Sequence, residues 1–346
     1  MSWEIDLWGR IRAATSASVA DFEASEFDFA TAQLSLAGQA TKAWFALAEA
    51  RDQVALTRST LATFRSTEQL IRDRFETGVE ENGRSFASEL LLAEGDVARA
   101  IDNLNSQEEL VGRSARQLEV LAGEYPAGVA GGNATLPSFP GQVPADLPAS
   151  LLDRRPDLAA AERRIAGADQ RLLEAKRALL PSIGLTSSFG TSSEDVSNLL
   201  NGDFSIWSIA GNIAQPILQG GRLRANISRQ DAELQVAAAE FEQAALTAFA
   251  EVENALGAEQ FLSNRVSALI QSARLNRAAY LRAREEFELG TGDILTVLSS
   301  QERDFTSRSQ LLTVRRLRLE NRVDLYLALG GSFYPRKIET TEPEKP

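Results

Sequence analysis

The chain has 346 residues, contains neither Cys nor His, and carries a formal net charge of −12 from 36 basic and 48 acidic side chains. Without Cys and His it lacks disulfides, thiolate nucleophiles and the commonest general base and metal ligand of proteins. The acidic balance argues against a nucleic-acid partner, because phosphate binding needs clustered positive charge. We therefore expect no catalytic centre, no cofactor and no bound metal.

The first residues predict a short strand that leads into a very long helix. Apolar and polar side chains alternate over residues 3–8, which is the period of a strand with one apolar face. From Arg10 to about Phe75 there is no Pro, and Gly38 is the only Gly. At ~1.5 Å per residue, such a helix is on the order of 100 Å long. Helices of ordinary globular domains are far shorter.

A return helix, a linker and a third helix follow. The return helix is expected over residues 86–122, and the Gly-Glu-Tyr-Pro run at 123–126 ends it. Residues 124–150 are rich in Pro, Gly and small side chains, so we interpret them as a connection without a hydrophobic core of its own. The third helix is predicted from Pro156, because Pro suits the first helical position and Asp157 adds negative charge to the first turn.

Two further strands are predicted over residues 182–189 and 204–217, where apolar side chains alternate with small or polar ones. Aliphatic residues on one face, with aromatic residues near the strand ends, are typical of strands that face lipid. A strand pair on a soluble core would show the same pattern. The predicted lipid-facing residues are Ile183, Leu185, Phe189, Trp207, Ile209 and Ile213.

A second long helical hairpin is predicted after Gly221. Apolar side chains recur every seven residues over 227–248, shift by four, and recur again over 252–287. Heptads with such an insertion predict helices that curl around neighbours without forming a simple two-stranded coil. Gly290 and Gly292 are expected to form the tight turn at the tip of the hairpin, since Gly accepts positive φ.

The two hairpins are copies of each other. The run Gly-Arg-Ile-Arg-Ala at 9–13 matches Gly-Arg-Leu-Arg-Ala at 221–225, an offset of 212 (221 − 9), and the same offset carries Gly78 onto Gly290. After the tip the offset falls to 207, so the first tip contains five more residues. We predict a first repeat at 1–123, a linker at 124–150, a second repeat at 151–331 and a polar, disordered tail at 332–346.

Five motifs occur in order along the chain. They are WEIDLWGRIR at 3–12, LLDRRPDLAAAERRI at 151–165, LLPSIGLTSSFG at 179–190, QPILQGGRLRA at 215–225 and EFELGTGDILTVLSSQ at 286–301. Together they resemble the TolC/OprM-type outer-membrane efflux channels, specifically the lipoprotein (NodT) class that serves resistance-nodulation-division pumps. The most specific motif supplies the family signature residues Arg154, Arg155, Pro156, Asp157 and Glu162. A charged helix entrance held by ion pairs is a second interpretation of the same residues.

The resemblance implies a mainly α fold with a small β part. Long antiparallel helical hairpins of a homotrimer would form an α-barrel tunnel, and each subunit would give strands to a transmembrane β-barrel in the lipids of the outer membrane. The implied function is the passive exit duct of a tripartite efflux pump, extending into the periplasm of a Gram-negative bacterium. Its implied partners are a periplasmic adaptor protein and an inner-membrane resistance-nodulation-division pump, and its cargo is drugs, other small molecules or metal ions.

The resemblance also places a gate and an adaptor-binding tip at the hairpin turns. The matching residues are Gly78, Gly290, Gly292, Asp293, Thr296 and Ser299. Relatives commonly carry Asp at one or both positions that match Thr296 and Ser299, and this chain carries none. An acidic ring would then come from Asp293, Glu302 or the acidic residues at 80, 81 and 89. Alternatively, these carboxylates are solvated tip residues.

The N-terminus of the chain differs from that of the family it resembles. Family members begin well upstream, with a signal peptide, a lipid-modified Cys, an N-terminal helix and a first strand, so we expect this chain to be N-terminally truncated and to supply three of four strands. A soluble coiled-coil scaffold or interaction protein is the alternative function, because the helices alone would permit it equally well.

Overall fold

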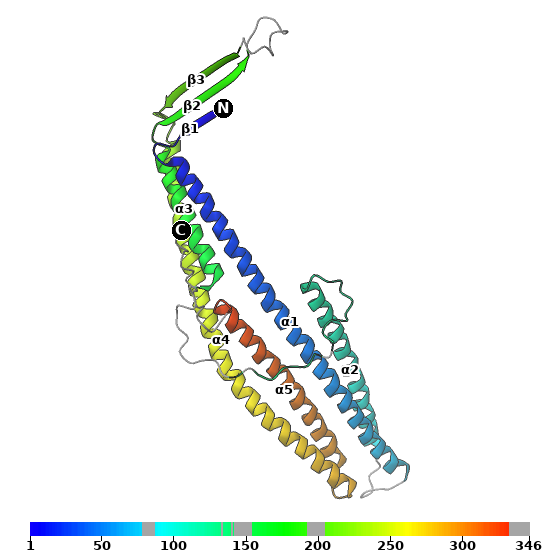
Figure 1. Cartoon of the computed structure of the whole chain (residues 1–346). Coiled ribbons are helices and arrows are strands. Elements are labelled where there is room, and N and C mark those ends of the chain that lie inside the picture. The colour runs from blue at the N-terminus through cyan, green and yellow to red at the C-terminus, as the bar shows by residue number, and fades with distance from the viewer. Residues whose placement is uncertain (78–86, 133, 140, 142–153, 192–204, 332–346) are drawn as a thin grey trace, which may run out of the picture. The chain divides into compact units, whose positions relative to one another are not determined.

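The computed structural model describes residues 1–77, 87–132, 134–139, 141, 154–191 and 205–331. Its elements, labelled in Figure 1, are β1 (Ser2–Ile5), α1 (Arg10–Glu76), α2 (Ala87–Leu121), α3 (Pro156–Arg177), β2 (Ser182–Thr191), β3 (Ser205–Ala214), α4 (Arg222–Glu288) and α5 (Ile294–Ala328). The protein is therefore mainly helical with a small sheet, as the sequence predicts.

The helix limits reproduce the internal repeat. α1 and α4 each contain 67 residues and begin 212 positions apart (222 − 10). α2 and α5 each contain 35 residues and begin 207 positions apart (294 − 87). The five extra residues of the first copy consequently lie between α1 and α2, where the sequence offset places them.

Two strands, β1 and β3, end earlier than predicted. β1 ends at Ile5, because the chain turns there and the Leu7 N–H donates to the Ile5 carbonyl at 2.9 Å. β3 ends at Ala214 and leaves Ile217 outside the strand. Pro216 lies just before Ile217 and lacks the N–H that a continuing strand would need.

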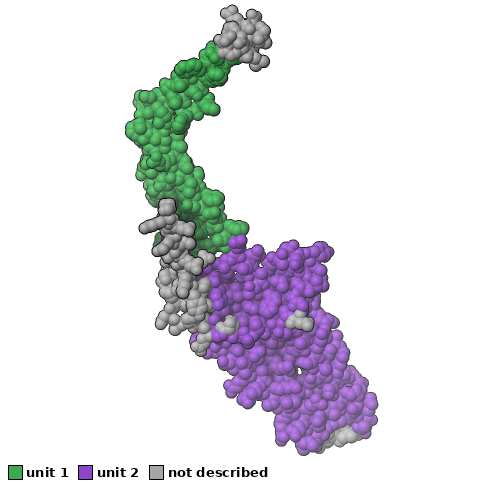
Figure 2. All heavy atoms as spheres, in the orientation of Figure 1, with its two compact units in different colours: residues 1–32, 152–249 green, residues 33–151, 250–346 purple. Residues whose placement is uncertain are grey.

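The chain divides into two compact units, which are coloured in Figure 2. The first comprises residues 1–32 and 152–249, and the second comprises residues 33–151 and 250–346. Each unit contains a part of both sequence repeats, so the repeats and the compact units are different divisions of one chain. The compact units do not test the predicted limits of the repeats and linker, which were 1–123, 124–150 and 151–331. The predicted disordered tail at 332–346 lies outside the described residues.

In the first unit, α3 packs antiparallel on the first part of α1. Nη1 of Arg177 donates to the Gly9 carbonyl at 2.6 Å, and Arg164 pairs with Asp28 at 2.6 Å. The buried residues between the two helices are small, which permits close packing. They include Ala13, Ala17, Ala20 and Ala24 of α1 and Ala160, Ala168 and Ala175 of α3.

In the second unit, one hydrophobic cluster joins all four long helices next to the second hairpin turn. This tip cluster consists of Ile71 (α1), Ala93 (α2), Tyr280, Ala283 and Phe287 (α4), and Ile294, Val297 and Leu298 (α5). The predicted heptad positions Val266, Ala273, Tyr280 and Phe287 are all buried. The seven-residue spacing therefore identified the face of α4 that packs on its neighbours.

Candidate functional site

The sheet carries its apolar side chains on one face. In the antiparallel register Ile5 lies opposite Ile183, and Ile183 lies opposite Ile213. Directly opposite residues of an antiparallel pair project to the same face of the sheet. The six predicted lipid-facing residues (Ile183, Leu185, Phe189, Trp207, Ile209 and Ile213) all lie on one face by this register, together with Trp3 and Ile5. We call this the apolar face.

The apolar face is exposed in the single subunit, and the opposite face is polar. Phe189 and Trp207 pair across the strands and are 83% and 72% exposed. On the other face, Ser188 and Ser208 share a hydrogen bond of 2.8 Å. A Cβ added at Gly184 of that face would lie 2.2 Å from Oδ1 of Asn212, so a side chain here would require the Asn212 side chain to move. A contiguous exposed apolar face marks a surface that another molecule or lipid covers.

The second hairpin turn depends on two glycines, but only Gly290 has the positive φ that we predicted for both. Gly290 has φ +76°, and the N–H groups of Thr291 and Gly292 both donate to the Glu286 carbonyl at 2.9 Å. These bonds satisfy a carbonyl at the C-terminus of α4, in the manner of a glycine C-cap. A Cβ at Gly292 would lie 2.8 Å from the backbone nitrogen of Phe287, so this position also excludes a side chain.

The start of α5 presents neutral hydroxyl groups at the predicted gate positions. Asp293 is the N-cap, and its carboxylate accepts a 3.4 Å hydrogen bond from the Leu295 N–H. Thr296 and Ser299 are exposed, while their neighbour Val297 is buried in the tip cluster. The Ser299 hydroxyl donates to the Thr296 carbonyl at 3.2 Å, so it is satisfied within the helix.

The other acidic residues expected near the gate have different surroundings. Glu302 is half-buried and lies 3.9 Å from Arg99 of α2, with which it forms a solvent-accessible ion pair. Glu89 lies in the first turn of α2 and accepts a 2.8 Å hydrogen bond from the Ser88 hydroxyl. Gly78, Glu80 and Glu81 lie outside the described residues.

The signature residues meet at the start of α3. Pro156 is the first residue of the helix, and Arg155 precedes it as a buried side chain. Arg155 donates to both carboxylate oxygens of Asp157, at 3.0 and 2.7 Å. Burial would raise the pKa of Asp157, but this guanidinium holds it below its ordinary value. Glu162 lies one turn further on, exposed, and pairs with Arg163 at 3.0 Å. The arrangement fits an ion-paired helix entrance.

Sequence reasoning missed the residues that hold the linker. Glu119 of α2 is 2% exposed and accepts hydrogen bonds from the N–H groups of Gly128, Val129 and Ala130 at 2.7, 2.7 and 2.9 Å. The bond from Gly128 is the main cause of a pKa below the ordinary value for this carboxylate. No local motif marks Glu119, because its partners belong to an irregular segment whose path the sequence does not define.

Comparison with known proteins gives the family. The family model described as outer membrane efflux protein matches residues 1–129 and 147–331. The chain belongs to the outer membrane efflux protein family. It is 31% identical over 340 residues to the solvent efflux pump outer membrane protein SrpC of Pseudomonas putida, a match that covers 96% of this chain and 70% of SrpC. It is 32% identical over 338 residues to the outer membrane protein OprJ of Pseudomonas aeruginosa, covering 96% and 68% of the two chains.

Solved structures support the same assignment. The outer-membrane channel OprN matches this chain with a TM-score of 0.89 at 26% identity, over 96% of this chain and 74% of OprN. The tunnel-forming helical fold expected from the resemblance is thereby confirmed.

Membership of the outer membrane efflux protein family decides between the functional classes considered above. The protein is an outer membrane component of an efflux pump that extends into the periplasm, and it is a transport component rather than an enzyme. The soluble scaffold is therefore the wrong alternative. Among the described helices, none has a stretch long and apolar enough to cross a membrane. Among the same residues, no three potential metal ligands gather into a site.

Proposed function

We propose that three copies of the chain form the passive exit duct of a tripartite efflux pump. The observation that carries this proposal is the pair of equal helical hairpins, α1–α2 and α4–α5, within one chain. A trimer would then bring together six hairpins of two alternating kinds, which suits a tunnel wall of twelve helices. Closed rings of this kind are the usual form of homo-oligomers.

The apolar face of the sheet is the proposed lipid-facing surface. Trp3, Phe189 and Trp207 place aromatic rings on this face, as membrane-facing strands do near the headgroups. The polar face, with Ser188 and Ser208, would line the water-filled interior. The strands would be completed by strands of neighbouring subunits, since unpaired strand edges are costly in lipid.

The second hairpin turn is the proposed gate and adaptor contact. Leu289 and Leu295 flank the glycine turn and are 71% and 43% exposed, so an apolar partner surface could cover them. Thr296 and Ser299 supply hydroxyl groups in place of the carboxylates that relatives commonly have. A ring of neutral hydroxyls would attract cations less than an acidic ring.

Organic compounds of low polarity are the proposed cargo, and an inner-membrane resistance-nodulation-division pump with a periplasmic adaptor is the proposed driving partner. Two relatives, each 31% identical to this chain, are named for such cargo: the solvent efflux pump outer membrane protein SrpC and the toluene efflux pump outer membrane protein TtgI. The duct itself would not select among them, because its proposed role is passive.

The proposal can be tested in a Gram-negative strain that lacks its own efflux system. The gene is expressed there together with the adaptor and pump of its own organism. Growth in toluene and in several antibiotics should be restored, and cross-linking in the membrane should give a trimer. Omitting the adaptor should abolish resistance while leaving the trimer. Resistance without the pump, or a monomer in an active strain, would contradict the proposal.

A further inference from the structure

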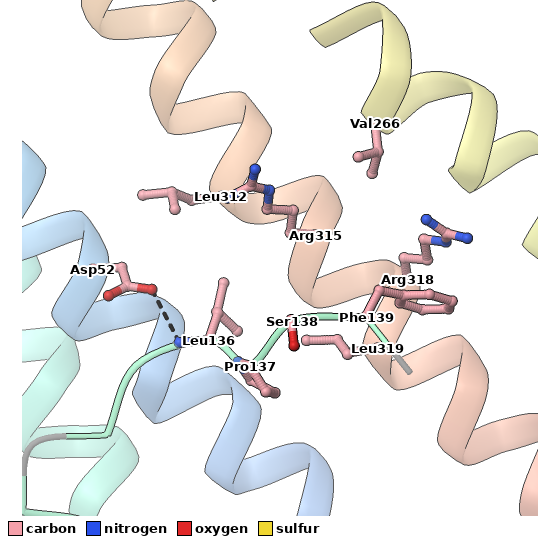
Figure 3. Close-up of a pocket in the computed structure, with 10 residues that line it drawn as sticks. All are labelled: Asp52, Leu136, Pro137, Ser138, Phe139, Val266, Leu312, Arg315, Arg318 and Leu319. Atoms are coloured by element: carbon pink, nitrogen blue, oxygen red, sulfur yellow. Dashed lines mark hydrogen bonds between the residues drawn. The ribbon is translucent and has the colours of Figure 1, made fainter. Parts of the chain in front are cut away.

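A cleft of about 470 Å³ lies in the second unit, where the described part of the linker crosses α5. Figure 3 shows Asp52 of α1 at one side, the linker residues Leu136 to Phe139 along it, and side chains of α5 beside them. Leu312 and Leu319 supply apolar walls, and Val266 of α4 closes the far side. The volume is in the range of sites that hold small organic molecules.

The linker wall of the cleft is held in place by charged side chains. Besides the three bonds to Glu119, the Arg51 guanidinium donates to the carbonyls of Gly131 and Ala130 at 2.6 and 2.8 Å. The Asp52 carboxylate accepts a 3.1 Å hydrogen bond from the Leu136 N–H, drawn as a dashed line in Figure 3. A pre-formed wall lowers the entropic cost of binding a ligand.

An aromatic ring at the end of this wall is fixed by two arginines. The Arg318 guanidinium lies 3.6 Å from the centroid of the Phe139 ring, and that of Arg322 lies 4.8 Å away. Arg318 is itself held by Glu259 of α4 at 2.8 Å. The ring thus stands as a rigid apolar surface, because its cationic neighbours are anchored to a carboxylate.

Arg315 differs from the other arginines of this part of α5. Within the described residues its side chain makes no ion pair or hydrogen bond, whereas Arg316 and Arg318 are both paired with glutamates. Arg315 lines this cleft and also an adjoining groove of about 400 Å³, which contains Arg308. An unpaired guanidinium beside apolar walls is complementary to an anion with an apolar body.

We propose that this cleft binds a small amphiphilic organic anion, such as an aromatic carboxylate or sulfonate. Its acidic group would pair with Arg315, and its apolar body would lie against Leu312, Leu319 and the ring of Phe139. The site is separate from the hairpin turn and from the apolar face of the sheet, so this proposal goes beyond the exit-duct function. The cleft lining contains Arg315 and Arg318 against one carboxylate, Asp52. Arg318 is paired with Glu259, and Asp52 accepts from the Leu136 N–H, so Arg315 is the lining charge that an anionic ligand would meet.

The proposal can be tested by titrating the full chain, in a non-ionic detergent, with naphthoate. Calorimetry or ligand-observed NMR measures the binding. We expect saturable binding with a Kd on the order of 0.1–1 mM, given the few atoms of the probe. Arg315→Gln should raise this Kd about tenfold, as expected for loss of one charge-assisted contact. Naphthamide, the neutral analogue, should bind the unchanged protein about as weakly as naphthoate binds the variant.

Arg265→Gln is the matched control. Arg265 is another exposed arginine that makes no side-chain ion pair within the described residues, and it lines a different groove between α4 and α5. This variant should leave the Kd unchanged. Phe139→Leu is a second variant. It should weaken the binding of naphthoate and of naphthamide equally, because it removes the aromatic ring but no charge. The proposal is overturned by non-saturable binding, or by equal effects of Arg315→Gln and Arg265→Gln.

Discussion

The guanidinium of Arg74 lies 3.9 Å from the ring centroid of Phe287 and donates a 2.5 Å hydrogen bond to the Phe287 carbonyl. This contact joins the end of α1 to the end of α4, beside the glycine turn. Phe287 is fully buried in the tip cluster, so Arg74 covers a side chain that anchors the end of α4 to the core.

Arg74→Leu should loosen the second hairpin turn. It removes a cation–π contact that contributes about 0.5–2 kcal/mol, together with a hydrogen bond to a carbonyl at the helix end. Single-channel conductance should rise, and cells should admit a large antibiotic that the closed gate excludes. Arg65→Leu is the control, because Arg65 is an exposed arginine of α1 without side-chain partners among the described residues. Equal conductance of the two variants would contradict a role for Arg74 at the gate.

Gly290→Val should abolish efflux while the protein remains folded. Valine at φ +76° costs about 1–3 kcal/mol of backbone strain and displaces the turn that we propose as the adaptor contact. Gly257→Ala is the matched control, since Gly257 lies inside α4 with open space around it. That variant should be stabilised by roughly 0.5–1 kcal/mol and keep full efflux. Measurements of trimer recovery and of resistance separate folding from function.

Glu119→Gln should remove a pH-dependent part of the stability. The pKa of Glu119 is depressed in the folded chain, so its stabilising contribution is complete above the unfolded value of about 4.3 and is lost as pH falls through the folded pKa. Thermal unfolding should therefore show a smaller difference between variant and parent at acidic pH than at pH 7. Glu124 is exposed and close in sequence, so Glu124→Gln is the control, and this variant should unfold like the parent at each pH. If the difference in stability between Glu119→Gln and the parent does not change with pH, the charge of Glu119 does not contribute to stability.

Ile209→Arg should prevent stable insertion into the outer membrane, and Ser208→Arg should not. The two residues are neighbours on β3 but project to opposite faces of the sheet. A charged side chain costs roughly 2–4 kcal/mol near the middle of the bilayer and little in an aqueous interior. Membrane fractionation of both variants measures this difference. Similar amounts of both in the membrane would refute the assignment of the apolar face to lipid.

The parts of the fold that could be predicted from the sequence are those that follow from regular spacing of residues along a helix or strand. Heptad spacing identifies the buried face of α4, and alternation identifies the apolar face of the sheet, because both follow from backbone periodicity. The offset of 212 residues predicts the equal lengths of α1 and α4. Gly290 follows from the rarity of positive φ in other residues, whereas Gly292 is required by a close approach of the Phe287 backbone that has no signature in the sequence.

Contacts between residues far apart in the chain could not be predicted in this way. Arg74 and Phe287 are joined by a packing arrangement of four helices, which periodicity does not specify. Glu119 binds a linker that composition alone marks as irregular, and the ring of Phe139 is fixed by arginines more than a hundred positions away. Such pairs depend on helix register and on the path of irregular backbone, neither of which has a local signature.

The unequal turns of the two hairpins restrict how any partner can bind them. Ten residues separate α1 from α2, whereas five separate α4 from α5. In the proposed trimer, six hairpin tips would therefore form three pairs of chemically distinct sites instead of six equal ones. A partner that engages all of them must either present two different surfaces or bind in two conformations, so true sixfold symmetry is impossible at this junction.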